Sequence, residues 1–112
     1  MRASIQDPDP VVFLENEMMY GREFDVPANI MSPDFVLPIG KAKIERAGTD
    51  LTIVAHAKMV GHSLEAAEEL QKTHGISVEV VNMRTIRPMD REAIINSVKK
   101  TNRIVTVEEG WP

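Results

Sequence analysis

Two arginines in one short connection have the type and spacing best suited to contact another molecule. Arg84 and Arg87 lie between an apolar segment that predicts a strand and an amphipathic segment that predicts a helix. Pro88 restrains the backbone around Arg87, and Asp90 is placed to cap the helix. A guanidinium binds carboxylates and carbonyl oxygens, and arginine is enriched at interfaces. We expect this loop to contact another chain or domain; local ion pairs or capping of neighbouring carbonyls are the competing interpretation.

Histidines and paired glutamates are weaker candidates for acid–base or metal chemistry. His56 and His62 follow a predicted strand, at the edge where open α/β sheets bind ligands, although hydrogen-bonded or solvent-facing histidines are the commoner case. His74 precedes Gly75 and fits a helix end. Two pairs of carboxylates are present, Glu15 with Glu17 and Glu108 with Glu109. Each pair could serve as a general acid and base, or could simply lie in a solvated loop. No histidine has a carboxylate at metal-ligand spacing, so we expect no metal site.

Composition limits the classes of protein to which this chain can belong. Its 112 residues fit one small domain, and its net charge is -4. There is no stripe of Lys and Arg with aromatic partners, which argues against a nucleic-acid surface. Cysteine is absent, so disulfides and thiolate chemistry are excluded. No apolar run approaches the roughly 20 residues of a membrane span, and we expect no membrane partner.

The candidate arginines, histidines and glutamates lie among alternating apolar strands and amphipathic helices, which must position them. Strands are predicted over residues 51–56, 76–81 and 103–107. Between them, one helix contains Val60 to Leu70 and stops at Gly75, and a second covers residues 90–100. Such alternation predicts an α/β fold, a β-α-β-α-β unit with a parallel sheet and right-handed crossovers.

Before this unit the sequence predicts one strand and a long connection. Pro10–Leu14 is a short apolar run between polar residues and predicts a buried strand whose own sheet lies outside the chain. Residues 21–48 are rich in proline and polar residues and predict an interdomain tether, although residues 40–48 also fit an extended edge segment. The chain begins shortly before one predicted strand and stops directly after another, so we expect a fragment of a longer protein.

Four segments resemble the beta subunits of pyruvate dehydrogenases, which belong to the thiamine-diphosphate-dependent, transketolase-like family. They are Leu14–Gly21, Pro38–Arg46, Arg84–Asp90 and Val105–Pro112. The similarity runs along essentially the whole chain in one register. It implies that residues 1–20 end a pyrimidine-binding domain, that residues 21–48 are a linker, and that residues 49–112 begin a transketolase C-terminal-like domain.

The resemblance also implies an activity for the complete protein. This is oxidative decarboxylation of pyruvate and acetyl transfer to lipoyl groups, with thiamine diphosphate and magnesium as cofactors. The implied partners are an alpha subunit, a second beta subunit and a dihydrolipoyl acetyltransferase core, in the mitochondrial matrix or alternatively a bacterial cytoplasm.

The resemblance assigns no catalytic, cofactor-binding or metal residue to this chain. The family's cofactor-activating glutamate lies upstream, and neither Glu15 nor Glu17 matches its motif. The segment is therefore expected to serve structure and subunit assembly, and to be inactive when isolated. The candidate residues of a subunit or domain interface are Tyr20, Arg84, Arg87 and Met89.

Two alternatives stay open. A branched-chain 2-oxo acid dehydrogenase beta subunit belongs to the same family, but the segments Leu14–Gly21 and Thr106–Pro112 resemble the pyruvate form more closely. From the residues alone, the chain also fits a self-contained, non-catalytic α/β interaction module. A parallel sheet of three strands is small for such a module, and its uncovered edge would invite association.

Overall fold

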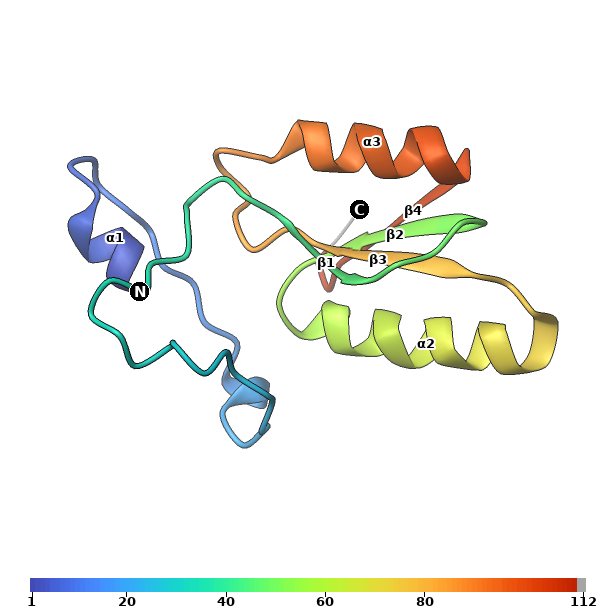
Figure 1. Ribbon diagram of the computed structural model, residues 1–112, viewed down its shortest axis with the longest axis horizontal. Helices are drawn as coiled ribbons and strands as arrows, with labels where there is room; N and C mark the ends of the chain where they lie inside the picture. The colour runs from blue at the N-terminus through green and yellow to red at the C-terminus, as the bar shows by residue number, and fades with distance from the viewer. Residues whose placement is uncertain (111–112) are drawn as a thin grey trace. The chain divides into compact units, whose positions relative to one another are not determined.

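The computed structural model describes residues 1–110, which fall into two compact units that divide after Ile39. The sheet lies in the second unit, which starts at Gly40 (Figure 1). Trp111 and Pro112, which close the last segment of the resemblance, lie outside the described residues.

A four-stranded mixed sheet forms the second unit. Its strands are β1 (Lys43–Arg46), β2 (Leu51–Ala55), β3 (Val78–Asn82) and β4 (Ile104–Val107), in the order β1-β3-β2-β4. β2 pairs in parallel with β3 and β4, which confirms the predicted β-α-β-α-β unit. β1 is antiparallel to β3, so the sheet as a whole is mixed and the predicted parallel unit forms three of its four strands. Residues 43–46 form this edge strand, which confirms the alternative prediction of an extended edge segment within residues 40–48.

One helix covers each face of this sheet, as Figure 1 shows. α2 (Lys58–His74) packs on the face that carries the larger of two buried apolar clusters. That cluster contains Ile53 and Ala55 from β2, Val78 and Val80 from β3, and Val60 and Ala67 from α2. These strand residues share a face because side chains alternate along a strand. α2 ends as predicted where Gly75 adopts a left-handed φ of 67°.

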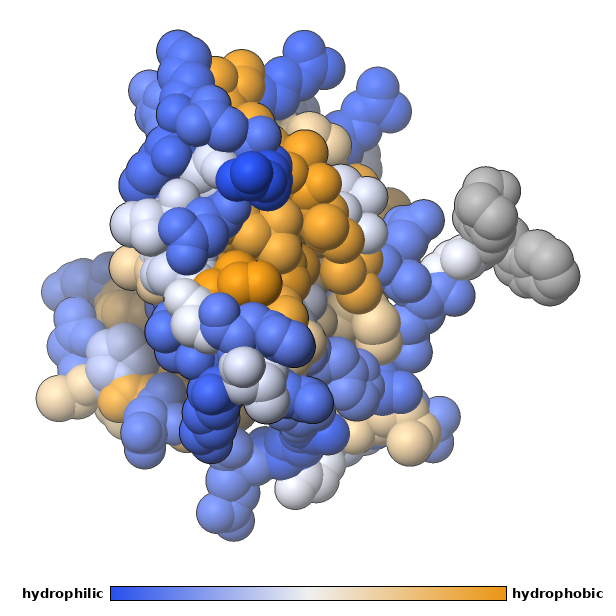
Figure 2. Space-filling view, turned by 90° about the vertical axis from the view of Figure 1, so that its right-hand side faces the viewer, coloured by the Kyte–Doolittle hydropathy of each residue, from blue (hydrophilic) through white to orange (hydrophobic). Residues whose placement is uncertain are grey.

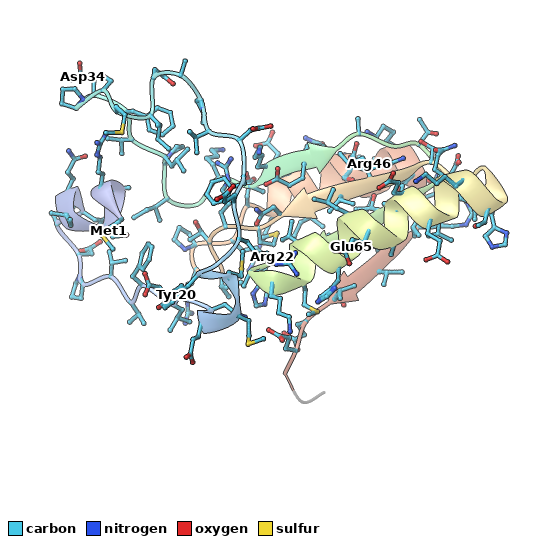
Figure 3. The ribbon with its side chains drawn as sticks, turned by 90° about the horizontal axis from the view of Figure 1, so that it is seen from below. Met1, Tyr20, Arg22, Asp34, Arg46 and Glu65 are labelled. Atoms are coloured by element: carbon cyan, nitrogen blue, oxygen red, sulfur yellow. The ribbon has the colours of Figure 1, made fainter. Side chains whose placement is uncertain are left out.

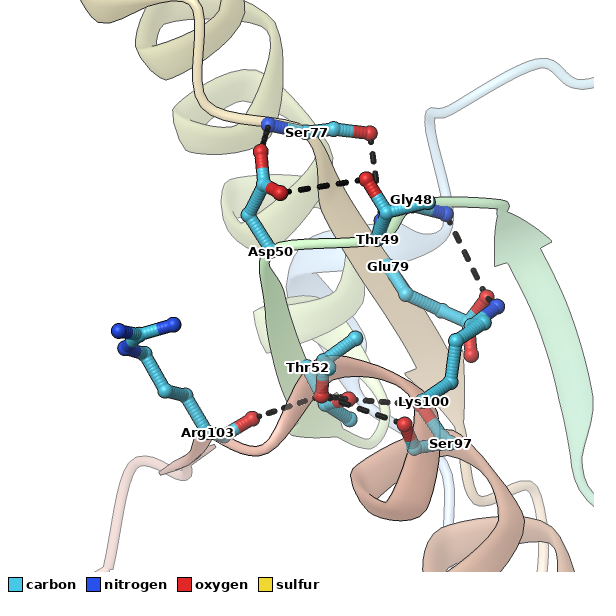
Figure 4. A network of polar contacts seen from close by, with 10 residues as sticks. Gly48, Thr49, Asp50, Thr52, Ser77, Glu79, Ser97, Lys100 and Arg103 are labelled. Atoms are coloured by element: carbon cyan, nitrogen blue, oxygen red, sulfur yellow. Dashed lines mark hydrogen bonds and ion pairs between the residues drawn. The ribbon is translucent and has the colours of Figure 1, made fainter.

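α3 (Arg91–Thr101) covers the opposite face, where a buried carboxylate replaces part of the apolar core (Figure 4). Glu79 of β3 is 3% exposed and accepts the Gly48 N–H at 3.4 Å. Its carboxylate also pairs with the Lys100 ammonium near the end of α3. Burial raises the pKa of Glu79, but hydrogen bonds from Lys100, Ser97 and the Gly48 N–H outweigh it and hold the pKa below its ordinary value.

A buried hydroxyl cluster lies beside this carboxylate. The Thr52 hydroxyl of β2 is 2.7 Å from that of Ser97 and 2.6 Å from that of Thr101. Thr101 also donates to the Arg103 carbonyl oxygen at 3.1 Å, at the start of β4. All three hydroxyl residues are buried, and their mutual hydrogen bonds compensate for the loss of water. The C-terminal half of α3 is thus attached to the sheet by polar contacts.

The first unit contains no strand among its described residues. It has a short helix, α1 (Arg2–Gln6), and a 3₁₀ turn, η1 (Glu17–Met19). The predicted strand Pro10–Leu14 is therefore wrong, and the side chains of Val12 and Leu14 are each 84% exposed. An isolated extended segment is not stable as a strand because its backbone groups need a neighbouring strand.

Tight packing at Gly48 gives a first prediction. A Cβ atom there would lie 2.2 Å from the Val78 carbonyl carbon and 2.3 Å from the Glu79 nitrogen. We expect Gly48→Ala to lower the free energy of unfolding by at least about 2 kcal/mol in urea titrations, because rigid backbone must move. Gly21→Ala is the control, since no atom lies within 4 Å of its added Cβ. Equal stability of the two variants would contradict this packing.

The buried carboxylate gives a second prediction. Because the folded pKa of Glu79 is lowered, its contribution to stability is complete above the unfolded pKa of about 4.3 and is lost as the pH falls through the folded value. Glu79→Gln should cost about 2 kcal/mol at neutral pH and flatten the acid limb of stability against pH. Glu69→Gln, on the exposed face of α2, should change neither. Parallel acid limbs for wild type and Glu79→Gln would refute the assignment.

Candidate functional site

The loop that follows β3 is anchored to the segment that enters the sheet. The Thr85 hydroxyl accepts the Gly40 N–H at 3.1 Å. The Asp90 carboxylate accepts the Ala42 N–H at 3.0 Å and the Ala93 N–H at 3.2 Å, which confirms Asp90 as the cap of α3. These two backbone hydrogen bonds lower the pKa of Asp90. The loop is held at both ends by residues of its own unit.

Between these anchors the loop presents cationic and apolar side chains to solvent. Arg84 and Arg87 are exposed, as are Ile86 and Met89. The backbone of Arg84 has a left-handed φ of 53°, and its N–H donates to the Asn82 side-chain oxygen at 3.1 Å. The Arg87–Pro88 peptide bond is cis. A rigid backbone carrying two exposed guanidinium groups matches the chemistry of a protein interface.

The carboxylate of Glu45, on which the charge of Arg84 acts, is already engaged with other partners. Glu45 of β1 pairs with Lys43 at 2.5 Å and accepts from the Asn82 side-chain amide at 2.9 Å. Burial raises the pKa of Glu45, but the hydrogen bonds from Lys43 and Asn82, helped by the charge of Arg84, lower it overall. Over residues 1–110, neither Arg84 nor Arg87 forms an ion pair. Both guanidinium groups therefore have room for an external carboxylate, although the charge of Arg84 also acts on Glu45.

The carboxyl edge of the sheet brings together residues that are distant in sequence. His56 follows β2 and lies with its Nε2 4.0 Å from a carboxylate oxygen of Glu108, which follows β4. Lys58, the first residue of α2, pairs with Glu109 at 3.4 Å. Sequence reasoning placed His56 at this edge but missed both pairings. The pairings could have been predicted from the strand order, because β2 and β4 are neighbours in a parallel sheet and their carboxyl ends lie at the same edge.

The remaining candidates are surface residues. His62 lies 3.4 Å from Glu65 on the exposed side of α2, and His74 ends that helix. Over residues 1–110, no three His, Cys, Asp or Glu side chains lie close enough together to hold a metal ion. In the same residues, no helix has the length and apolar character needed to cross a membrane.

Tyr20 lies in the first unit (Figure 3), whereas the other three interface candidates lie in the second. Its hydroxyl donates to a carboxylate oxygen of Glu15 at 2.8 Å, and this hydrogen bond raises the pKa of Tyr20. Asn16 caps the turn between them by accepting the Met18 N–H at 3.1 Å. Glu15 thus orients an exposed tyrosine, and Glu17 begins η1.

Comparisons with known proteins show the family to which the chain is similar. Residues 40–112 match the family model of the transketolase C-terminal domain. The chain is 62% identical over 112 residues to the mitochondrial pyruvate dehydrogenase E1 component subunit beta of Pisum sativum and equally to that of Mus musculus, covering all of this chain and 31% of each relative. The protein of the same name from Saccharomyces cerevisiae is 57% identical over 112 residues, of which the chain covers 30%.

A solved structure described as split gene transketolase, inactive beta4 tetramer, also resembles the chain. The TM-score is 0.63 at 39% sequence identity, over 71% of this chain and 26% of that one. The chain therefore spans less than a third of the length of the relatives it matches. The residues that match the family model include the sheet and its loops, since the match begins at Gly40, where the second unit begins.

The Asp90 anchor gives a third prediction. We expect Asp90→Ala to speed amide hydrogen exchange at Ala42 and Ala93, because both N–H groups lose their acceptor. Asp90→Asn should have a smaller effect, since one side-chain oxygen remains. Exposed Glu92 supplies the control, and Glu92→Ala should leave the Ala42 amide unchanged. Unchanged exchange at Ala42 in Asp90→Ala would disprove the anchoring role.

Proposed function

The chain belongs to the transketolase family through its C-terminal domain, and from this membership we propose that it is a segment of a pyruvate dehydrogenase beta subunit. One observation carries the proposal. Identity of 57–62% extends over all 112 residues to pyruvate dehydrogenase E1 beta subunits of plants, mammals and yeast. Because those relatives are much longer, the activity belongs to the longer protein and its complex rather than to this segment alone.

The proposed activity of the complete enzyme is oxidative decarboxylation of pyruvate followed by acetyl transfer to lipoyl groups. Thiamine diphosphate, with magnesium, would supply the chemistry that stabilises the carbanion left by decarboxylation. The part of the chain that the structure describes does not fit a magnesium site, since it has no group of three suitable ligands. We therefore assign to residues 1–110 no step that passes through the cofactor.

The segment's own proposed role is assembly, through the loop between β3 and α3. Anchors at Thr85 and Asp90 fix the backbone, so binding would cost little conformational entropy. Exposed Ile86 and Met89 supply apolar area beside the two guanidinium groups. This combination fits a partner surface that offers carboxylates around an apolar patch, and we propose the alpha subunit or a second beta subunit as that partner.

The same family membership supports proposals for the rest of the chain. Tyr20 would belong to a second contact surface, carried by the end of a preceding pyrimidine-binding domain at residues 1–20. Residues from 21 to the start of the sheet would link the two domains. The complex would include a dihydrolipoyl acetyltransferase core. The proposed compartment is the mitochondrial matrix, because the related beta subunits are named as mitochondrial.

Substitution of Arg87 tests this role in the full-length beta subunit co-expressed with its alpha partner. We expect Arg87→Ala to weaken assembly about tenfold in sedimentation and to lower pyruvate oxidation in proportion, since interface arginines contribute strongly to binding. Arg91→Ala is the matched control, because Arg91 is exposed on α3 outside the loop. Normal assembly of Arg87→Ala would reject the interface, whereas assembly with alpha but no pyruvate oxidation by wild type would reject the enzyme assignment.

A further inference from the structure

Two residues of the segment that enters the sheet hold the loop between β3 and α3 near both of its ends. The Gly40 N–H donates to the Thr85 hydroxyl at 3.1 Å. The Ala42 N–H donates to the Asp90 carboxylate at 3.0 Å. Ala42 also packs against the buried cluster that contains Met83, the residue directly after β3. One short segment therefore contacts the loop at three points, although the bonded residues lie 45 and 48 positions apart in the sequence.

The conformation of Gly40 brings this segment close to a fourth residue of the loop. Gly40 has a left-handed φ of 78°, which residues other than glycine rarely adopt. A Cβ atom added there would lie 3.0 Å from Cγ of Pro88. The position therefore needs glycine both for its backbone conformation and for its approach to Pro88.

The loop has an inner side that contacts residues 40–42 and an outer side that faces solvent. The inner side consists of Met83, Thr85 and Asp90, which are buried or half-buried. The outer side carries four exposed side chains, namely Arg84, Ile86, Arg87 and Met89. Because residues of the two sides alternate along one short backbone, a shift of the inner residues changes the spacing of the outer ones.

The contacts of residues 40–42 can open while the sheet stays folded. Gly40 and Ala42 are only half-buried, and Lys41 between them is exposed. The centre of the sheet is better protected, since Val80 and Val81 of β3 are fully buried. Segments with few buried contacts open most readily. The chain thus has a closed state with both hydrogen bonds formed, and an open state in which the Gly40 and Ala42 N–H groups bind water.

We propose that residues 40–42 and the loop form a latch, which couples partner binding at the loop to the chain that precedes the sheet. The proposal rests on the assembly role proposed for the loop. A partner that binds the outer side chains in their closed arrangement favours the closed state, and closing favours binding by the same factor. Gly40, the first residue of the second unit, is bonded to Ile39, the last residue of the first. The latch therefore transmits partner binding to the boundary between the two units.

The latch occupies one end of the second unit, on the left of that unit in Figure 1. The opposite end faces the viewer in Figure 2 and presents apolar surface in a strip with hydrophilic borders. Substitutions within the latch do not alter the side chains of that strip. A change in assembly that they cause therefore reports on the loop.

Amide hydrogen exchange in the full-length beta subunit, with and without its alpha partner, tests the latch. We expect Thr85→Val to speed exchange at Gly40, because the hydroxyl acceptor is lost while the shape of the side chain is kept. The same variant should weaken assembly about threefold in sedimentation, since the open state competes with binding. Thr73→Val is the matched control, because the Thr73 hydroxyl lies on the exposed side of α2 and donates to the Glu69 carbonyl. This control should change neither exchange at Gly40 nor assembly.

Assembly should in turn slow exchange at Gly40 and Ala42 in the wild-type subunit, because partner binding and latch closure are reciprocal. Three results would each overturn the latch. They are unchanged exchange at Gly40 in Thr85→Val, faster exchange without weaker assembly, and assembly that leaves exchange at Gly40 and Ala42 unchanged.

Failure of the latch can be told apart from failure of the assembly role. If Arg87→Ala weakens assembly and Thr85→Val does not, the interface is retained and the coupling is rejected. If neither variant weakens assembly, the interface is rejected and the coupling with it. Weaker assembly in both variants, with faster exchange at Gly40 only in Thr85→Val, is the result expected for a latch behind an interface.

Discussion

The second unit depends on the burial of one carboxylate, Glu79, in the middle of its sheet. A buried charge is costly unless partners surround it, and two separate segments provide them: the turn at Gly48, and helix α3 through Lys100 and Ser97. The geometry at Gly48 is part of the same constraint, because its approach to the β3 backbone leaves no room for a Cβ. Satisfying Glu79 therefore sets the position of α3 over the sheet.

The position of α3 also fixes the segments that its two ends contact. Its C-terminal turn contacts β2 and the start of β4 through Thr52, Thr101 and Arg103. Its N-terminal cap, Asp90, also accepts from Ala42, so the loop after β3 and the segment entering β1 are tied together. The loop with Arg84 and Arg87 consequently has a fixed backbone although its side chains are exposed. A charged loop held in this way can bind a partner without a large ordering cost.

Sequence periodicity predicted the elements whose apolar spacing matches the side that they bury in the fold. α2 and α3 have apolar residues at helical spacing, and Gly75 and Asp90 mark their ends. Pro10–Leu14 has an equally apolar pattern but forms no strand, because a strand requires partners that hydropathy does not reveal. For β1 the sequence left two alternatives, linker or edge segment, because Lys43, Glu45 and Arg46 give it no apolar pattern and its pairing with β3 decides the outcome. The contact of His56 with Glu108 needed the strand order as well as the sequence.

The distribution of charge supports the proposed assembly role of this segment. At the carboxyl edge of the sheet, where α/β enzymes place reactive groups, Lys58 pairs with Glu109 and His56 lies 4.0 Å from Glu108, so these side chains already have local partners. The rigid loop after β3 instead carries two exposed guanidinium groups, Arg84 and Arg87, which form no ion pair within residues 1–110. An exposed, preorganised guanidinium gains most by meeting a carboxylate as water is excluded, which happens when two protein surfaces close. In the proposed assembly role, Arg84 and Arg87 would gain this stabilisation by meeting carboxylates of the partner.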